Sequence, residues 1–170
     1  MIKSYILDEK IFSSSKEAFM LNDKSFFGEK RNGKIEYTPI EAKFLLDSKK
    51  MELYSNKEKL SELKIHKKLR KIDKKIEIKN LVFTDLRKKG YIVKSALKFG
   101  AEFRVYEKGK NPEQEHAKWI VFPIKENESI KWQEFSAKNR VAHSTKKKLL
   151  LALVDVEDNI TYYEIAWIKA

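Results

Sequence analysis

The segment from Asp85 to His116 alternates glycine breaks with short apolar runs, a pattern that predicts a helix end followed by strands. Gly90 follows two lysines, which is typical of a helix end. Glycine adopts the left-handed conformation at low cost, and lysines suit the negative end of the helix dipole. A strand is expected from Tyr91. Polar and apolar residues alternate from Glu102 to Tyr106, so the Tyr106 side chain is expected on the polar face, at a strand end.

Two side chains of this segment can transfer protons, the phenol of Tyr106 and the imidazole of His116. Gly109, Asn111 and Pro112 break regular structure, which places His116 on or just after a loop. Catalytic groups are often held on such loops. Considered singly, however, Tyr106 also fits a packed strand tyrosine and His116 an exposed loop residue.

Composition limits the classes of protein that this chain can be. A chain of 170 residues can bury one good core or two small ones. The net charge of +12 favours a polyanionic partner, although it also fits a solvated basic surface. The absence of cysteine excludes disulfides, thiolate zinc sites and cysteine nucleophiles, and it fits an intracellular chain. No apolar run is long enough to span a membrane, and no signal peptide is evident at the N-terminus.

The first part of the chain reads as a small α+β domain without chemistry of its own. Strands are expected at Ile2–Leu7 and Lys10–Phe12, and Gly33 suggests a hairpin turn. Thr38 and Pro39 form a helix start, with Thr38 as the cap and Pro39 at the first helical position. The chain is expected to return as a strand near residues 51–54. We interpret this domain as a packing or assembly surface.

Residues 56–75 are rich in lysine, and apolar side chains recur at helical spacing within and just after them. These are Ile65, Leu69, Ile72 and Ile76. The pattern favours a charged helix packed on a core over an RNA-binding helix, and His66 is expected to be exposed. Asp73 is a candidate cap for a second helix over residues 74–89. The domain boundary is therefore expected near residues 75–80, giving domains 1–77 and 78–170.

The remaining C-terminal segments predict two further strands and a helix after the central stretch. Residues 117–124 are apolar on both faces, which is typical of a strand inside a sheet, with Pro123 at its end. A short helix is expected over residues 132–138. Residues 148–154 and 160–168 then form a hairpin around an acidic turn. Aromatic residues on both faces of the last strand indicate a covered sheet or a subunit interface.

Several of these motifs occur in an order that resembles a known family. They are Lys98-Phe99-Gly100-Ala101-Glu102-Phe103-Arg104-Val105-Tyr106, then His116-Ala117, then Arg140-Val141-Ala142-His143-Ser144 with a basic run and an apolar strand. Over residues 78–170 the chain resembles the C-terminal domain of archaeal tRNA-splicing endonucleases. The resemblance implies an α+β fold, in which a small N-terminal α/β domain precedes a restriction-endonuclease-like α/β domain with a mixed sheet.

RNA carries its own nucleophile, the 2′-hydroxyl, so a protein can cleave it with three groups. One accepts the 2′ proton, one protonates the leaving 5′ oxygen, and a cation stabilises the charge on phosphorus. The resemblance assigns these roles to Tyr106 as base, His116 as acid and Lys147 as stabiliser. Lys146 and Lys148 remain alternatives for the lysine. The resemblance also implies a 2′,3′-cyclic phosphate and a 5′-hydroxyl as products, with no metal and no cofactor.

A tyrosine is a poor base unless nearby cations lower its pKa, and Lys98, Arg104 and Lys108 are candidates for that effect. His143 is expected to be structural and hydrogen-bonded near a helix end, and it is a weaker candidate for the acid. The resemblance aligns Arg140 with an arginine that clamps an extruded bulge base, although Arg140 also fits a plain surface arginine.

In the family that this chain resembles, the substrate is a bulge–helix–bulge in precursor tRNA, cleaved in the cytoplasm by a tetramer. The resemblance implies a homotetramer, or a heterotetramer with a paralogous structural subunit. It assigns an assembly loop to Asp155, Glu157 and Asp158, which also fit an ordinary turn. Two other functions stay open: a non-catalytic subunit of the same assembly, and a non-enzymatic RNA-binding protein.

Overall fold

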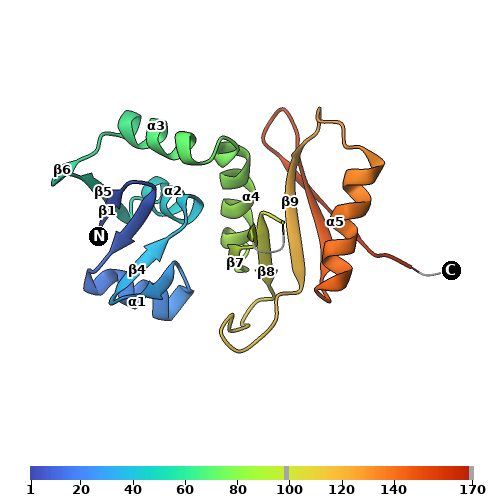
Figure 1. The fold of residues 1–170 in the computed structure, drawn as a ribbon, viewed down its shortest axis with the longest axis horizontal. Coiled ribbons are helices and arrows are strands. Elements are labelled where there is room, and N and C mark those ends of the chain that lie inside the picture. Colours follow the sequence, from blue (N-terminus) through green and yellow to red (C-terminus); the bar gives the residue numbers. More distant parts are fainter. Residues whose placement is uncertain (98–99, 169–170) are drawn as a thin grey trace. The chain divides into compact units, whose positions relative to one another are not determined.

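The computed structural model describes residues 1–97 and 100–168, and the chain divides into two compact units, residues 1–80 and 81–170. Each unit contains its own mixed sheet together with helices (Figure 1), so the predicted two-part α+β fold is confirmed. Helix α4, Ile76–Lys88, contains the point at which the chain passes from the first unit to the second. Among the described residues, no helix combines the length and the apolar character needed to cross a bilayer.

The N-terminal unit is a six-stranded sheet with three helices before α4, in the strand order β3-β4-β2-β1-β5-β6. The β1–β5 pair is parallel and the other pairs are antiparallel. The elements are β1 Ile2–Leu7, β2 Lys10–Ser13, α1 Lys16–Ser25, β3 Glu29–Arg31, β4 Lys34–Tyr37, α2 Pro39–Asp47, β5 Met51–Ser55, β6 Glu58–Lys59 and α3 Glu62–Ile72. The predicted strands, the hairpin at Gly33 and the helix start at Thr38 are therefore confirmed.

Helix α1 has no counterpart among the elements predicted from the sequence. Its buried residues are only Ala18 and Asn22, so it lacks the apolar stripe that marks a helix in a sequence. Ser15 caps the helix, since its hydroxyl accepts a hydrogen bond from the Ala18 N–H at 3.3 Å. The Asn22 amide donates to the carbonyls of Phe27 and Gly28 at 2.9 and 3.0 Å, which explains a polar residue at a buried position.

Glu41 joins helix α2 to the chain that precedes strand β3. Its carboxylate accepts hydrogen bonds from the backbone N–H groups of Thr38 and Gly28, at 3.0 and 2.9 Å, and its side chain belongs to a capping box with Thr38. The residue is only 2% exposed. Two backbone donors thus depend on one buried carboxylate.

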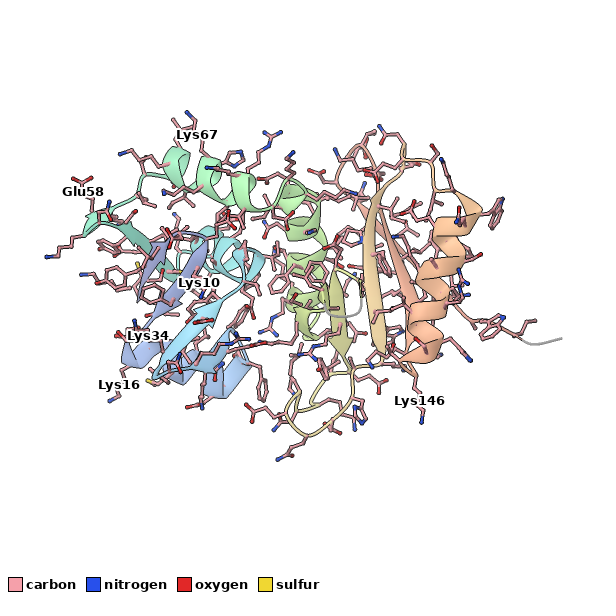
Figure 2. All side chains as sticks on the ribbon, viewed as in Figure 1. Lys10, Lys16, Lys34, Glu58, Lys67 and Lys146 are labelled. Carbon is pink, nitrogen blue, oxygen red and sulfur yellow. The ribbon has the colours of Figure 1, made fainter. Side chains whose placement is uncertain are left out.

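We expect Glu41→Ala to lower the free energy of unfolding by about 2–4 kcal/mol, because it removes a helix cap and leaves a second buried N–H without a partner. Urea unfolding followed by circular dichroism measures the loss. Glu58→Ala, at an exposed carboxylate in β6 (Figure 2), is the control and should change stability by less than about 0.5 kcal/mol. A Glu41→Ala loss as small as that of the control would contradict this role.

The lysine-rich helix and the second helix predicted after Asp73 are both present, as α3 and α4. Helix α3 ends at Ile72, and the apolar series continues into α4, where Ile76 is fully buried, as is Leu69 in α3. The carboxylate of Asp73 accepts from the N–H of Lys75 at 3.0 Å, close to the predicted cap. The side chain of Lys67 extends away from α3 (Figure 2), and His66 is exposed, as predicted.

The C-terminal unit is a five-stranded sheet in the order β11-β10-β9-β8-β7. Helix α5 connects β9 to β10, which pair in parallel, and the remaining pairs are antiparallel. Helices α4 and α5 lie on opposite sides of this sheet (Figure 1). The elements are β7 Ile92–Ser95, β8 Phe103–Tyr106, β9 Trp119–Lys125, α5 Trp132–Ser144, β10 Lys148–Val154 and β11 Ile160–Ile165.

Strand β9 has a strand on each side, as its apolar character on both faces predicted. The position expected for Pro123 was wrong, because Pro123 lies inside β9 and pairs with Ala152 of β10. The pairing of β8 with β9 ends at Val121, so Pro123 has a strand on one side only, and a residue without an N–H is tolerated there. Helix α5 is longer than predicted, and β11 ends before Trp167.

Candidate active site

The strand register brings distant parts of the C-terminal unit to one end of its sheet. Val105 of β8 pairs with Trp119 of β9, and Trp119 pairs with Lys148 of β10. Tyr106 and Lys147, the next residues outward on either side, therefore flank the segment that enters β9. The Lys118 N–H donates to the carbonyl of Val105, and its carbonyl accepts from the Lys148 N–H, both at 2.9 Å.

Tyr106 lies on the face of the sheet that it shares with Arg104, but this face is covered. Tyr106 is only 3% exposed, so its surroundings are not the polar ones that the alternation indicated, and they fit the alternative of a packed strand tyrosine. The alternation of β8 correctly identifies the face on which Tyr106 lies. That face is covered by a core formed by tertiary packing, which the local sequence does not indicate. The core includes Ile120, Leu149 and Ala142 of α5. The phenol is therefore largely shielded from solvent in the free chain.

Burial raises the pKa of the Tyr106 phenol, and the Arg104 guanidinium lowers it by a smaller amount. The lowering effect expected of a nearby cation is therefore present at Arg104, but burial outweighs it. Of the three candidates for that effect, Arg104 alone acts on Tyr106 among the described residues, with its Cζ 6.0 Å from the ring centroid. Lys108 instead lies over the ring of Tyr91, and Lys98 lies outside the described residues.

His116 is exposed on the loop that connects β8 and β9. The loop has internal support, because the Glu115 carboxylate accepts from the Lys110 ammonium at 2.6 Å and from the Asn111 N–H at 2.8 Å. Ala117, the next residue after His116, is buried and fixes the loop where it enters β9. In the described part of the chain, the His116 side chain makes no hydrogen bond or ion pair, so its imidazole is open to a ligand.

Three consecutive lysines between α5 and β10 occupy different environments. Lys146 has a positive φ of 55° and extends outward (Figure 2), and Lys148 is exposed and paired with Glu164. Lys147 is only partly exposed, and its ammonium donates to the carbonyl of Thr145 at 2.9 Å. Burial lowers the pKa of the Lys147 amine, and the nearby Arg104 charge lowers it further. Lys147 is therefore the least exposed of the three lysines, and the Arg104 charge acts on its amine.

Helix α5 carries two other predicted residues, Arg140 and His143. Both are exposed, and they lie one turn apart near the end of the helix. The His143 ring packs edge-on against Trp167, with 4.2 Å between ring centroids. His143 thus has a packing contact in place of the hydrogen bond that was expected for it.

The acidic segment after β10 is a tight hairpin turn in which the three carboxylates differ. Asp155 accepts from the N–H groups of Glu157 and Asn159, both at 2.8 Å, and hydrogen bonds with Asn159 lower the pKa of its carboxyl. Asp158 has a left-handed backbone with φ of 63°. Asp155 therefore stabilises the turn, and Glu157 and Asp158 are left exposed.

Two observations bear on ligands of this unit. In residues 1–97 and 100–168, no three histidine, aspartate or glutamate side chains are grouped so that they could hold a metal ion. Arg104 and Lys147 both give this end of the sheet positive charge, and the Arg104 charge acts on the Lys147 amine, which the sequence pattern alone did not indicate. A buried phenol, an exposed imidazole and two cations at one end of a sheet form a site suited to a phosphodiester.

Comparisons with known proteins agree with this class of site. Residues 76–162 match the model of the tRNA intron endonuclease catalytic C-terminal domain, and residues 2–65 match that of the tRNA intron endonuclease N-terminal domain. The chain therefore belongs to the tRNA intron endonuclease family. The resemblance predicted from the sequence is confirmed, and it extends into the N-terminal unit, where the sequence had shown only a packing surface.

Individual relatives are similar over most of their length. A tRNA-splicing endonuclease of Thermococcus kodakarensis is 38% identical over 99% of both chains. One of Nanoarchaeum equitans is 45% identical over 76% of this chain and 87% of its own. One of Methanothermobacter thermautotrophicus is 39% identical over 88% of this chain and 86% of its own.

Proposed function

We propose that this chain is the catalytic subunit of an endonuclease that cleaves precursor tRNA at the exon–intron junctions of a bulge–helix–bulge. The observation that carries the proposal is the register, which gathers Tyr106, Lys147 and the loop of His116 at one end of a sheet in a chain of this family. The family names the class of substrate, and the site supplies groups that suit its chemistry.

The proposed reaction is an internal transfer in which the RNA provides the nucleophile. Tyr106 in its phenolate form takes the proton of the 2′-hydroxyl, the 2′ oxygen bonds to phosphorus, and the bond from phosphorus to the 5′ oxygen breaks. His116 protonates that leaving oxygen, and the Lys147 ammonium stabilises the charge that develops on the non-bridging oxygens. The products are a 2′,3′-cyclic phosphate and a 5′-hydroxyl, as for a lyase that needs no metal or cofactor.

Burial raises the pKa of the Tyr106 phenol, so the proposed base is protonated in the free chain at neutral pH and must lose its own proton before it can take that of the 2′-hydroxyl. An imidazole that is open to solvent suits the opposite role, since an acid must reach the leaving oxygen. The rival function, a non-catalytic RNA-binding or structural subunit of the same assembly, requires none of the three groups. Their retention at one sheet end therefore favours the enzyme.

The direct test is to incubate the purified chain, with a chelator present, with an end-labelled bulge–helix–bulge RNA. We expect cleavage in the bulges with cyclic phosphate and 5′-hydroxyl ends. An RNA carrying 2′-deoxyribose at the scissile positions is the control and should remain intact, because it lacks the nucleophile. Cleavage of this control, or products ending in a 3′-hydroxyl, would contradict the mechanism.

A substrate with two bulges calls for two sites at a fixed separation, which a two-fold assembly provides. We propose a homotetramer, or a heterotetramer with a paralogous structural subunit, that acts in the cytoplasm and uses the acidic hairpin in assembly. Arg140, exposed on α5, is proposed to stack on an extruded base.

The hairpin proposal predicts that Glu157→Lys with Asp158→Asn lowers the mass of the assembly measured by light scattering. These two carboxylates are exposed, and the double variant spares Asp155, which holds the turn. Glu58→Lys, a charge change in the other unit, should leave the mass unchanged. An unchanged mass in the hairpin variant would limit this segment to a turn.

A further inference from the structure

Arg104 contains a buried polar atom without a partner. Its Nε is buried and has no hydrogen-bond partner among the described residues. A buried, charged donor without a partner is costly, and such a group in a native protein calls for an explanation, of which a role in binding or catalysis is one. The same guanidinium lies 6.0 Å from the ring centroid of Tyr106, so the donor is close to the proposed base.

Like charges gather around Arg104. Lys94 lies directly opposite it in the β7–β8 pair and is only 8% exposed, although like charges at opposed positions are unfavourable. Lys147 approaches from the other side of the sheet end, close enough for the Arg104 charge to act on its amine.

We propose that Arg104, together with Lys147, binds the non-bridging oxygens of the scissile RNA phosphate, with the buried Nε–H as one donor. The planar guanidinium presents donors in a fixed fork that fits two phosphate oxygens, whereas the lysine acts as a point charge. Donors fixed before the reaction stabilise the charge that grows in the transition state. This inference rests on the proposed function and adds a second cation to it.

The position of Arg104 also links the phosphate to the base. One guanidinium that contacts both the phenol ring and the phosphate would hold the 2′-hydroxyl near the Tyr106 oxygen. Arg104→Lys keeps the charge but loses the fork and the Nε donor, and Arg104→Gln loses the charge as well. The two variants therefore separate charge from geometry.

We expect Arg104→Gln to slow single-turnover cleavage of the bulge–helix–bulge RNA about 100-fold at saturating enzyme, and Arg104→Lys to slow it about tenfold. Arg31→Gln, which removes an exposed arginine already paired with Glu29 in the other unit, is the matched control and should cleave at the wild-type rate. Thermal unfolding of each variant verifies that the fold is kept. Cleavage by Arg104→Gln within twofold of the wild-type rate would overturn the proposal.

A second measurement needs no RNA cleavage. Titration with inorganic phosphate should shift the NMR signal of the Arg104 Nε–H saturably. That signal is assigned by its absence in Arg104→Lys, and Lys147→Gln should weaken the response several-fold. Arg31, paired with Glu29 in the other unit, is the internal control. A response no larger than that of Arg31 would overturn the anion site. A wild-type chain that leaves RNA intact while Arg104 still responds would instead refute the proposed function and support the site.

Discussion

Replacing His116 by alanine is expected to slow single-turnover cleavage of a bulge–helix–bulge RNA by about 10²- to 10⁴-fold, the usual range for loss of a general acid. RNA affinity, measured with the uncleavable 2′-deoxy RNA, should stay close to that of the wild type. The imidazole is one exposed group on a loop, whereas the affinity comes from many phosphate contacts.

The substrate can reveal the role of His116 directly. An RNA with sulfur in place of the leaving 5′ oxygen needs no acid, because a thiolate leaves without a proton. On this RNA the His116→Ala variant should recover most of the lost rate. His143→Ala is the matched control, since His143 packs on Trp167 and should be dispensable. Equal losses on the oxygen and sulfur substrates would remove His116 from the role of acid.

Gly28→Ala is expected to destabilise the chain by about 3–5 kcal/mol, the largest stability effect that we predict. Gly28 has φ of 71°, where a side chain is strained, and an added Cβ would lie 2.4 Å from Cγ2 of Ile35 and 2.8 Å from the backbone oxygen of Glu36. Ile35 is fully buried and cannot move aside cheaply.

Gly33→Ala provides a close control for this glycine. Gly33 has the same φ of 71°, but a Cβ there would meet no atom within 4 Å. We therefore expect Gly33→Ala to cost only about 1–2 kcal/mol, the conformational part alone. Urea unfolding of both variants isolates the steric part as their difference. Equal losses of stability in the two variants would show that the residues around Gly28 can move to accommodate the added Cβ, and would contradict the steric part of this prediction.

Much of the fold was predictable because it follows local rules. The helix start at Thr38, the helix end at Gly90 and the interior character of β9 all depend on residues within a few positions of one another. Helix α1 was not predicted from the sequence because its buried side is made of Ala18 and Asn22, which form no apolar stripe. Helix α1 is stabilised by hydrogen bonds to the loop that follows it, and the spacing of apolar residues in the sequence does not reveal such bonds.

The sequence allowed the residues of the candidate site to be named, but it did not indicate how buried those residues are or which charges lie near them. The alternation of β8 indicates which way Tyr106 points, but α5 and its core decide that the phenol is buried and that its pKa rises. The proximity of Arg104 to Lys147 depends on the parallel pairing of β9 with β10. Sequence patterns do not encode that register, so Arg104 could be named only as a neighbour of the tyrosine.

The parallel pairing of β9 and β10 also affects the stage of folding at which the residues of the candidate site come together. A parallel pair needs a long crossover, here through α5, so β10 can take its place only after that whole segment has been synthesised. Contacts between segments so distant along the chain are slow to form. On the ribosome, we therefore expect Tyr106 to be in place in β8 well before Lys147 joins it at the end of the sheet.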